Sequence, residues 1–363
     1  MFRRSRRPAH PTTHPTTDSS CSARVGIAGT ILRRVDYEVE RDLADVVRPW
    51  RDVYIDLRAR RSLAIRGGQF KVPFGLDQLT GAMDLDFAYR SLAGTYLTPG
   101  RDLGVMAHGR VFDDTVKYQA GLFRQGGDNV RASERADTRS SRTVAGRVTA
   151  KPWSGAKAGS KLRSLVVGLA FVDGRLPEGL HSLRGKTVTG SALATPFYMA
   201  GRRQRLGAEL QWRQGPAAVQ GEFIRARDQR RGQGLDNEDL PSAVADGWYL
   251  SGTWIVTGER KKDTVRPGNP ILSGGVGAVE LAARVERFAF GRDSWSGESF
   301  LSPRDASIAR KGDTVWTTGV NWYPSDYVRL QANVIRERYD AGPLVTHGQT
   351  AVWSHTFRAQ FGF

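Results

Sequence analysis

WSHTFRAQFGF, residues 353–363, ends the chain and alternates between two kinds of side chain. Positions 353, 355, 357, 359 and 361 carry Trp, His, Phe, Ala and Phe, and the positions between them carry polar residues. Since successive side chains of a β-strand point to opposite faces, this period of two predicts a strand with two different environments. The last strand of a soluble β-sandwich would show the same pattern, so the rest of the chain must decide.

The same alternation recurs along the body of the chain. Residues 52–60, DVYIDLRAR, place Val53 and Ile55 on one face and Asp52 and Asp56 on the other. About fifteen such segments, separated by Gly, Pro, Asp and Asn clusters, predict an all-β protein without a long helix. Tilted strands of about 9–11 residues can span a bilayer. The chain contains no apolar run of about 18 residues, so no transmembrane helix is predicted.

The connections between these segments are of two lengths. Tight turns such as FDDT (112–115) and YPSD (323–326) alternate with longer polar linkers. The linkers are 124–141, 174–202, 229–246, 258–275 and 291–312. Short turns at one end and long loops at the other are typical of a transmembrane β-barrel.

The aromatic residues favour the barrel over the sandwich. A barrel turns its apolar face to lipid and its charged face to water, with aromatic rings at the headgroups. Aromatics near the strand ends are Trp248, Trp254, Trp316, Trp322, Trp353, Phe361 and Phe363. Because unpaired strand edges are costly in hydrocarbon, the first strand of a barrel must meet the last. The final strand, with Phe357, Phe361 and Phe363, is then interpreted as the closing strand and assembly signal of an outer-membrane protein.

The composition restricts the possible functions. Lys and Arg number 54 against 37 Asp and Glu, which gives a net charge of +17. This excess predicts an anionic partner: nucleic acid, an acidic membrane surface or small anions. Cys21 is the only cysteine, so no intrachain disulfide forms. The six His show no ligand spacing, and neither a metal nor another cofactor is expected.

The N-terminal segment differs from the rest. Residues 1–20 are rich in Arg, Pro and Thr and contain no apolar stretch of the kind found in a secretory signal peptide. We interpret them as disordered or mis-annotated, and residues 21–363 as the β-barrel domain.

Several motifs, in order, resemble one family. GGQFKVPFGLDQLTGAMDLDFAYRSL (67–92), TTGVNWYPSDYVRLQANVIRERYD (317–340) and the final FRAQFGF resemble the phosphate-selective porin O and P family. The resemblance spans roughly residues 23–363 and implies a trimeric barrel of about sixteen strands in a Gram-negative outer membrane. It implies passive diffusion of anions such as phosphate, no enzymatic chemistry, and contacts with membrane lipids and the outer-membrane assembly machinery. It also implies an N-terminally truncated chain, which lacks a signal peptide and about one strand and cannot close a sixteen-stranded barrel.

The resemblance carries over to few individual residues. Asp52 and Arg90 match family positions that face the pore constriction. Cys21 and Ser22 stand where phosphate-selective members have an Arg pair, and Gln78 stands where they have a Lys. These departures argue against high phosphate selectivity and leave an anion preference.

Basic residues on the polar faces are predicted to line the pore. They are Arg58, Arg60, Arg66, Arg110, Lys117, Arg147, Arg205, Arg213, Arg284, Arg329 and Arg358, partly offset by Glu209, Glu222, Glu280 and Glu286. Guanidinium groups suit oxyanions, and transport needs several weak stations rather than one deep site. For each inward Arg except Arg90, the alternative role is that of a cross-strand partner for a nearby acid.

Two other functions compete with the porin hypothesis. One is a soluble basic β-protein that binds nucleic acid, although no basic stripe is interleaved with stacking aromatics. The other is a barrel enzyme, for which no nucleophile and base are grouped. Asp113 and Asp114 are interpreted as turn residues, and the porin hypothesis excludes nucleic acid as a partner.

Overall fold

The computed structural model describes residues 21–124, 142–157, 159–181, 187–188, 190, 197–292, 311–340 and 351–362. In these residues fifteen strands form a single sheet in which each strand pairs with its sequence neighbours. The strands are β1 (Arg24–Ile31), β2 (Val35–Asp42), β3 (Trp50–Arg60), β4 (Leu63–Lys71), β5 (Arg101–Val111), β6 (Val116–Phe123), β7 (Thr143–Ala150), β8 (Val166–His181), β9 (Phe197–Gln214), β10 (Ala217–Arg230), β11 (Leu240–Ile255), β12 (Ala278–Arg292), β13 (Lys311–Ser325), β14 (Val328–Tyr339) and β15 (Ala351–Phe361). The predicted all-β fold is therefore confirmed.

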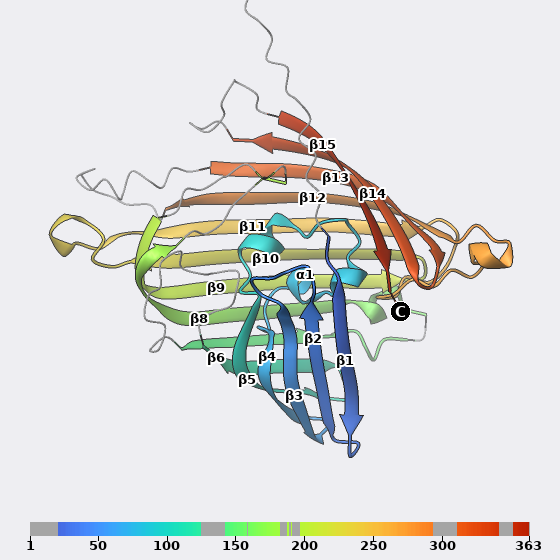
Figure 1. Cartoon of the computed structure of the whole chain (residues 1–363), viewed down its shortest axis with the longest axis horizontal. Coiled ribbons are helices and arrows are strands. Elements are labelled where there is room, and N and C mark those ends of the chain that lie inside the picture. The colour runs from blue at the N-terminus through green and yellow to red at the C-terminus, as the bar shows by residue number, and fades with distance from the viewer. Residues whose placement is uncertain are drawn as a thin grey trace, which may run out of the picture.

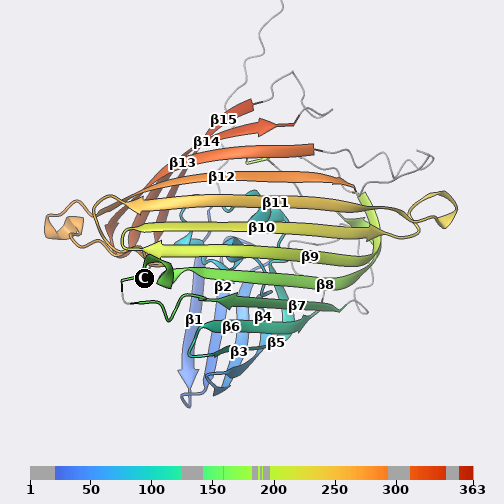
Figure 2. The ribbon, with the colours of Figure 1, turned by 180° about the vertical axis from the view of Figure 1, so that it is seen from behind.

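The sheet curls around an interior. β1 to β4 lie across from β8 to β12, and the short helices lie between these two parts of the wall in both views (Figures 1 and 2). All neighbouring strands are antiparallel, as in the β9–β10 and β14–β15 pairs. Within the described strands, β1 and β15 are not joined by a hydrogen-bonded ladder. Among the described helices, none is both apolar and long enough to cross a membrane.

The two faces of the sheet have opposite chemistry. Large apolar side chains point outward, and Leu169 and Leu206 are 69% and 61% exposed. Polar and charged side chains at alternate positions point inward, and Arg205 and Glu222 are buried. This is the arrangement that lipid outside and water inside require.

The predicted turn at 112–115 is confirmed, but the turn predicted at 323–326 lies at 326–327, because β13 continues to Ser325. The tight turns after β1, β3, β5, β9 and β13 lie at one end of the sheet, here called the short-turn end. The connection 256–277 between β11 and β12 lies at this end too, although the sequence pattern assigned 258–275 to the long loops. Much of the predicted linkers 174–202 and 229–246 is strand. Gly and charged residues at the ends of these strands look like loop sequence, yet their backbones continue the ladders, with register shifts between Leu176 and Gly179 and between Asp228 and Arg230.

Residues 72–100 connect β4 to β5 and turn into the interior; we call them the internal segment. They contain α1 (Leu76–Leu79), the 3₁₀ turn η1 (Ala82–Asp84) and α2 (Leu92–Tyr96). The sequence pattern did not predict this inward fold.

Apolar packing holds the internal segment against the wall. Its buried residues Val72, Phe74, Leu92, Ala93 and Leu97 join inward-facing apolar side chains of the strands in one cluster. Burying a side chain such as Phe74 contributes about 1.5–3 kcal/mol.

A wall glycine permits this close approach. A Cβ on Gly247 of β11 would lie 2.8 Å from the Ala93 Cβ, so only glycine fits there. The small residue in the wall thus lets α2 pack directly on the sheet.

Candidate functional site

Carboxylates of the wall hold the ends of the internal segment's helices. Glu222 of β10 accepts the backbone N–H groups of Leu76 at 2.9 Å and Asp77 at 3.2 Å. Glu286 of β12 accepts the N–H of Leu92 at 2.6 Å. The first N–H groups of a helix lack intrahelical partners, so these acids satisfy buried donors that would otherwise destabilise the segment. Both acids were predicted as counter-charges for pore arginines; Glu222 instead binds backbone.

The internal segment is also bound to itself. The Asp77 carboxylate accepts the Ser91 N–H at 2.8 Å and the Ser91 hydroxyl at 2.9 Å, and Ser91 Oγ caps α2 by accepting the Gly94 N–H at 3.0 Å. Arg90 donates to the carbonyl oxygens of Asp77 and, at 2.8 Å, Thr80. Arg90 is therefore fixed by the segment that carries it.

Arg284, predicted to line the pore, has a packing role. Its guanidinium lies 4.5 Å from the Phe87 ring centre and 4.3 Å from that of Tyr89. It forms an ion pair with Glu286 at 3.0 Å and donates to the Tyr89 carbonyl at 3.3 Å. Burial also raises the pKa of the Tyr89 hydroxyl above its ordinary value. These contacts match the alternative role, that of a partner for an acid.

Four basic side chains in or beside the internal segment form no ion pair with an acid within the described part of the chain. We call them the constriction cations: Lys71, Arg90, Arg329 and Arg358. Lys71 Nζ donates to the carbonyls of Leu79 and Thr80 at 3.1 Å each. Arg329 donates to the Met83 carbonyl at 3.0 Å.

The constriction cations influence one another electrostatically. Arg358 feels the charges of Arg329 and Arg90, and Lys71 feels that of Arg90. Burial lowers the pKa of the Arg90 guanidinium, and the Asp77 carboxylate opposes this shift. The four come from β4, the internal segment, β14 and β15, so tertiary structure gathers a positive region.

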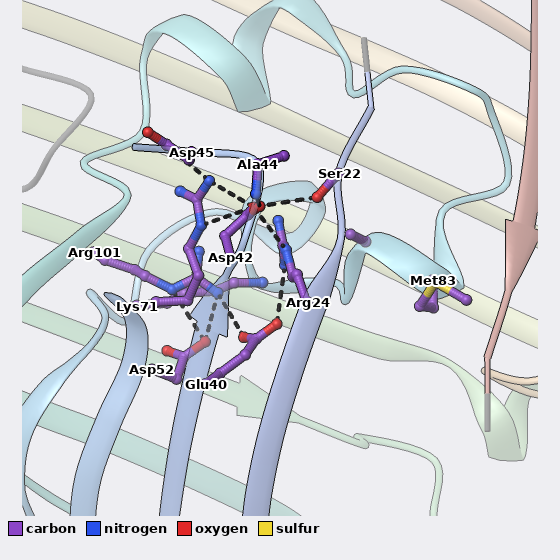
Figure 3. A network of polar contacts seen from close by, with 12 residues as sticks. Ser22, Arg24, Glu40, Asp42, Ala44, Asp45, Asp52, Lys71, Met83 and Arg101 are labelled. Carbon is purple, nitrogen blue, oxygen red and sulfur yellow. Dashed lines mark hydrogen bonds and ion pairs between the residues drawn. The ribbon is translucent and has the colours of Figure 1, made fainter. Parts of the chain in front are cut away.

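Asp52, the other predicted constriction residue, belongs to a neighbouring ion-pair network (Figure 3). Arg101 binds the Asp52 carboxylate at 2.5 Å and lies 3.9 Å from Glu40. Asp42 accepts from Arg24 at 3.3 Å and from Arg51 at 2.9 Å. Asp52 is thus paired with Arg101.

Carboxylate oxygens of Glu38, Glu40 and Asp52 lie within 4.8 Å of one another. Arg101 and the Tyr54 hydroxyl, which donates to Glu38 at 2.7 Å, already bind this group. The acids therefore serve as partners for protein donors.

Most other predicted pore-lining residues have acidic partners. The ion pairs are Arg58–Asp36 at 2.7 Å, Arg66–Asp56 at 2.7 Å, Arg147–Glu209 at 2.5 Å, Arg205–Asp228 at 2.7 Å, Arg213–Asp263 at 2.6 Å and Arg110–Asp114 at 4.0 Å. Lys117 is half-buried opposite Arg110, and Arg60 is exposed beside the β3–β4 turn. The ion pairs fit the alternative role of partner for a nearby acid, although Asp114 lies in the β5–β6 turn and Asp263 in the β11–β12 connection.

The C-terminal strand presents its aromatic rings outward. Phe357 and Phe361 are 81% and 67% exposed on the outer face, and Phe363 lies outside the described residues. Their predicted role in assembly is a matter of recognition by other proteins and stays a prediction.

Three residues of the site were not predicted from the sequence. Lys71 and Asp77 lie in the motif 67–92, which served only to indicate the family. Lys261 lies in the predicted linker 258–275. A buried role for the last could not be read from KKD at 261–263, because its partners Asp86 and Glu280 are distant in sequence.

Solved structures share this fold at low sequence identity. OmpT of Vibrio cholerae, folded in vitro, is 15% identical with a TM-score of 0.57, covering 94% of this chain and 89% of that protein. OmpF of Salmonella typhi in complex with daunomycin is 9% identical with a TM-score of 0.52, covering 95% and 93%. The outer membrane channel DcaP of Acinetobacter baumannii is 10% identical with a TM-score of 0.51, covering 94% and 84%.

Sequence comparison identifies the family. A search of curated proteins found no match. Residues 21–363, nearly the whole chain, match the family described as phosphate-selective porin O and P. Together with the β-barrel fold, this match confirms the predicted transmembrane barrel and outer-membrane location and argues against the soluble alternative. The chain is therefore a channel of the Gram-negative outer membrane rather than an enzyme, and it belongs to the phosphate-selective porin O and P family.

Proposed function

We propose that this porin passes small anions by passive diffusion and prefers them over cations. The observation that carries the proposal is the group of constriction cations, Lys71, Arg90, Arg329 and Arg358, none of which forms an ion pair with a carboxylate of the described residues. Most other inward arginines are balanced by acids, so these four dominate the local field.

The expected strength of this field suits transport. A unit charge 4 Å away is worth about 1 kcal/mol in water and about 4 kcal/mol at an effective dielectric of 20. Several sites of this size favour anion entry without trapping the ion. Arg side chains suit phosphate and other oxyanions because their planar donors match two oxygens at once.

We also infer a homotrimer embedded in outer-membrane lipids. A trimer form has been solved for OmpT of Vibrio cholerae, which shares the fold. The exposed apolar outer face is the surface that lipid or neighbouring subunits would cover.

Planar-bilayer recording of the refolded protein tests the proposal. In a KCl gradient, the reversal potential should follow the chloride equilibrium potential, and cation selectivity would overturn the proposal. Phosphate added to a chloride solution then distinguishes two pores: saturable block indicates an oxyanion site, and no block indicates a general anion pore.

A further inference from the structure

The β11–β12 connection sends a buried charge to the internal segment. Lys261 is only 7% exposed, and its Nζ lies 2.5 Å from Asp86 Oδ1 and 2.6 Å from Glu280 Oε1. Asp86 belongs to the internal segment and Glu280 to the wall strand β12. One ammonium group therefore joins three parts of the fold.

A hydrogen-bond network surrounds this ion pair. Asn321 and Tyr323 of β13 donate to the second Glu280 oxygen at 3.0 Å and 2.8 Å. The Asn321 amide also donates to the Asp86 carbonyl at 2.9 Å. A buried ion pair withstands its desolvation cost only when such bonds satisfy the remaining polar atoms. The network fixes residue 86 against the wall.

The connection that carries Lys261 has independent anchors. Val265 is buried with Ile255, Ala278 and Tyr323 in a separate apolar cluster. The Lys261 backbone N–H donates to the Gly215 carbonyl at 2.8 Å. The Lys261 side chain therefore extends from a fixed base, and it can hold the segment in place.

The segment held in this way contains one of the constriction cations and binds two others. Arg90 lies four residues after Asp86, and Lys71 and Arg329 donate to carbonyls of the same segment. We propose that Lys261 is a positioning residue for the pore: it holds the internal segment against β12 and β13, and so sets the pore width and the place of the constriction cations. This inference rests on the proposed anion pore, and Lys261 itself does not touch the passing anion.

The sign of the selectivity change tests the proposal. Asp86→Ala removes the ion pair between the segment and Lys261, and it leaves the Lys261–Glu280 pair and the Asn321 bond to the residue 86 carbonyl intact. Loss of a negative charge alone would raise the preference for anions, whereas displaced constriction cations should lower the anion-to-cation permeability ratio by about twofold or more. Open-channel current noise should rise as well. An unchanged or raised ratio would overturn the proposal.

Lys261 itself is tested against its neighbour. Lys261→Met should lower the ratio and raise the noise, and Lys262→Met, which removes the same charge from an exposed side chain, should leave both near wild type. Lys261→Arg, which keeps a cation between the two acids, should retain most of the wild-type ratio. Equal changes in all three variants would show that charge or chain disturbance, rather than the buried ion pair, is responsible.

These measurements distinguish failure of the proposed function from failure of the proposed role of Lys261. If wild-type protein forms cation-selective pores, the proposed function fails before any variant is measured. If wild-type pores prefer anions and Asp86→Ala pores behave identically, only the role of Lys261 fails. Heat-modifiable gel mobility, measured on every variant, identifies correctly folded protein, and only folded variants enter the comparison.

Discussion

The Glu222 carboxylate accepts the backbone N–H of Leu76 at 2.9 Å across a sequence separation of 146 residues. The acid lies on the β10 wall, and the N–H lies at the start of α1 in the internal segment. Carboxyl oxygens at a helix start accept hydrogen bonds from the free N–H groups and so favour the helix. The wall strand β10 thus holds the internal segment in place.

Removal of this acceptor should loosen the segment. Glu222→Ala leaves the part-buried N–H of Leu76 and the buried N–H of Asp77 without a partner, and a buried unpaired donor costs about 1–3 kcal/mol. We expect greater single-channel noise and a lower temperature for the heat-induced mobility shift. Glu222→Gln, whose amide oxygen still accepts one bond, should lie between. Glu238→Ala, at an exposed acid, serves as the control, and equal behaviour of the two Ala variants would contradict this role.

Arg358 should contribute directly to anion preference. Its side chain faces the interior from β15 and has no carboxylate partner among the described residues. A unit charge about 4 Å from an ion in water is worth about 1 kcal/mol, or about fivefold in permeability ratio. Arg358→Gln should lower the ratio by up to this factor, as measured from reversal potentials near 0.1 M salt, where screening is modest.

Arg336 provides the matched control for that measurement. It lies on the outer face of β14 with its guanidinium 5.5 Å from the Trp353 ring centre. Arg336→Gln removes the same charge away from the interior and should leave the reversal potential near wild type. Equal shifts in both variants would count against an interior role for Arg358.

Acid should loosen the β11–β12 connection through Glu259. Partial burial pushes the pKa of this carboxyl upward, but hydrogen bonds from Thr257 Oγ1 and the Gly268 N–H outweigh burial and hold the pKa below its ordinary value. A depressed carboxyl pKa stabilises the fold above the unfolded value, and this contribution is lost as the pH falls through the folded value. Channel noise should therefore increase below about pH 4.

Glu259→Gln isolates this effect. The amide cannot titrate, so its noise should no longer change across the same acidic range. A variant that retains the full wild-type pH response would place the titrating group elsewhere.

The outward aromatic ring of Phe361 should matter for assembly. Phe361→Ser removes a ring that is 67% exposed on the outer face near the end of β15. We expect less heat-modifiable, folded protein in outer-membrane fractions of cells that export the chain. Phe112→Ser, which removes a 77% exposed ring at the β5–β6 turn, costs a similar apolar contact without altering the final strand. Equal losses would indicate lost lipid contact rather than a C-terminal signal.

The strands and their faces could be predicted because the controlling pattern is local. In β3, Ile55 and Leu57 point outward and Asp56 points inward, as the alternation predicts. The same period of two correctly predicted that the Phe357 ring points outward and the Arg205 guanidinium points inward. The number of strands could also be predicted, because turn residues interrupt the alternating pattern between one strand and the next.

The contacts of the constriction could not be predicted in the same way. Family resemblance pointed to Asp52 and Arg90, but the structure pairs Asp52 with Arg101 and binds Arg90 to backbone carbonyls. Each charged residue has many possible partners in a sequence this basic. The bounds of the linkers were predicted wrongly for a related reason, since polar residues extend the strands beyond the apolar band.

By itself, the sequence determined the strands, their two faces and the positive charge of the chain, because side-chain alternation has a fixed period of two and charge is a sum over residues. Tertiary structure alone decided which basic side chains in the described part of the chain form no ion pair with an acid. It brings Glu222 to Leu76 and Lys261 to Asp86, and so determines how the internal segment folds into the barrel. Such contacts depend on how the sheet curls, and curvature over fifteen strands is not encoded in any single segment.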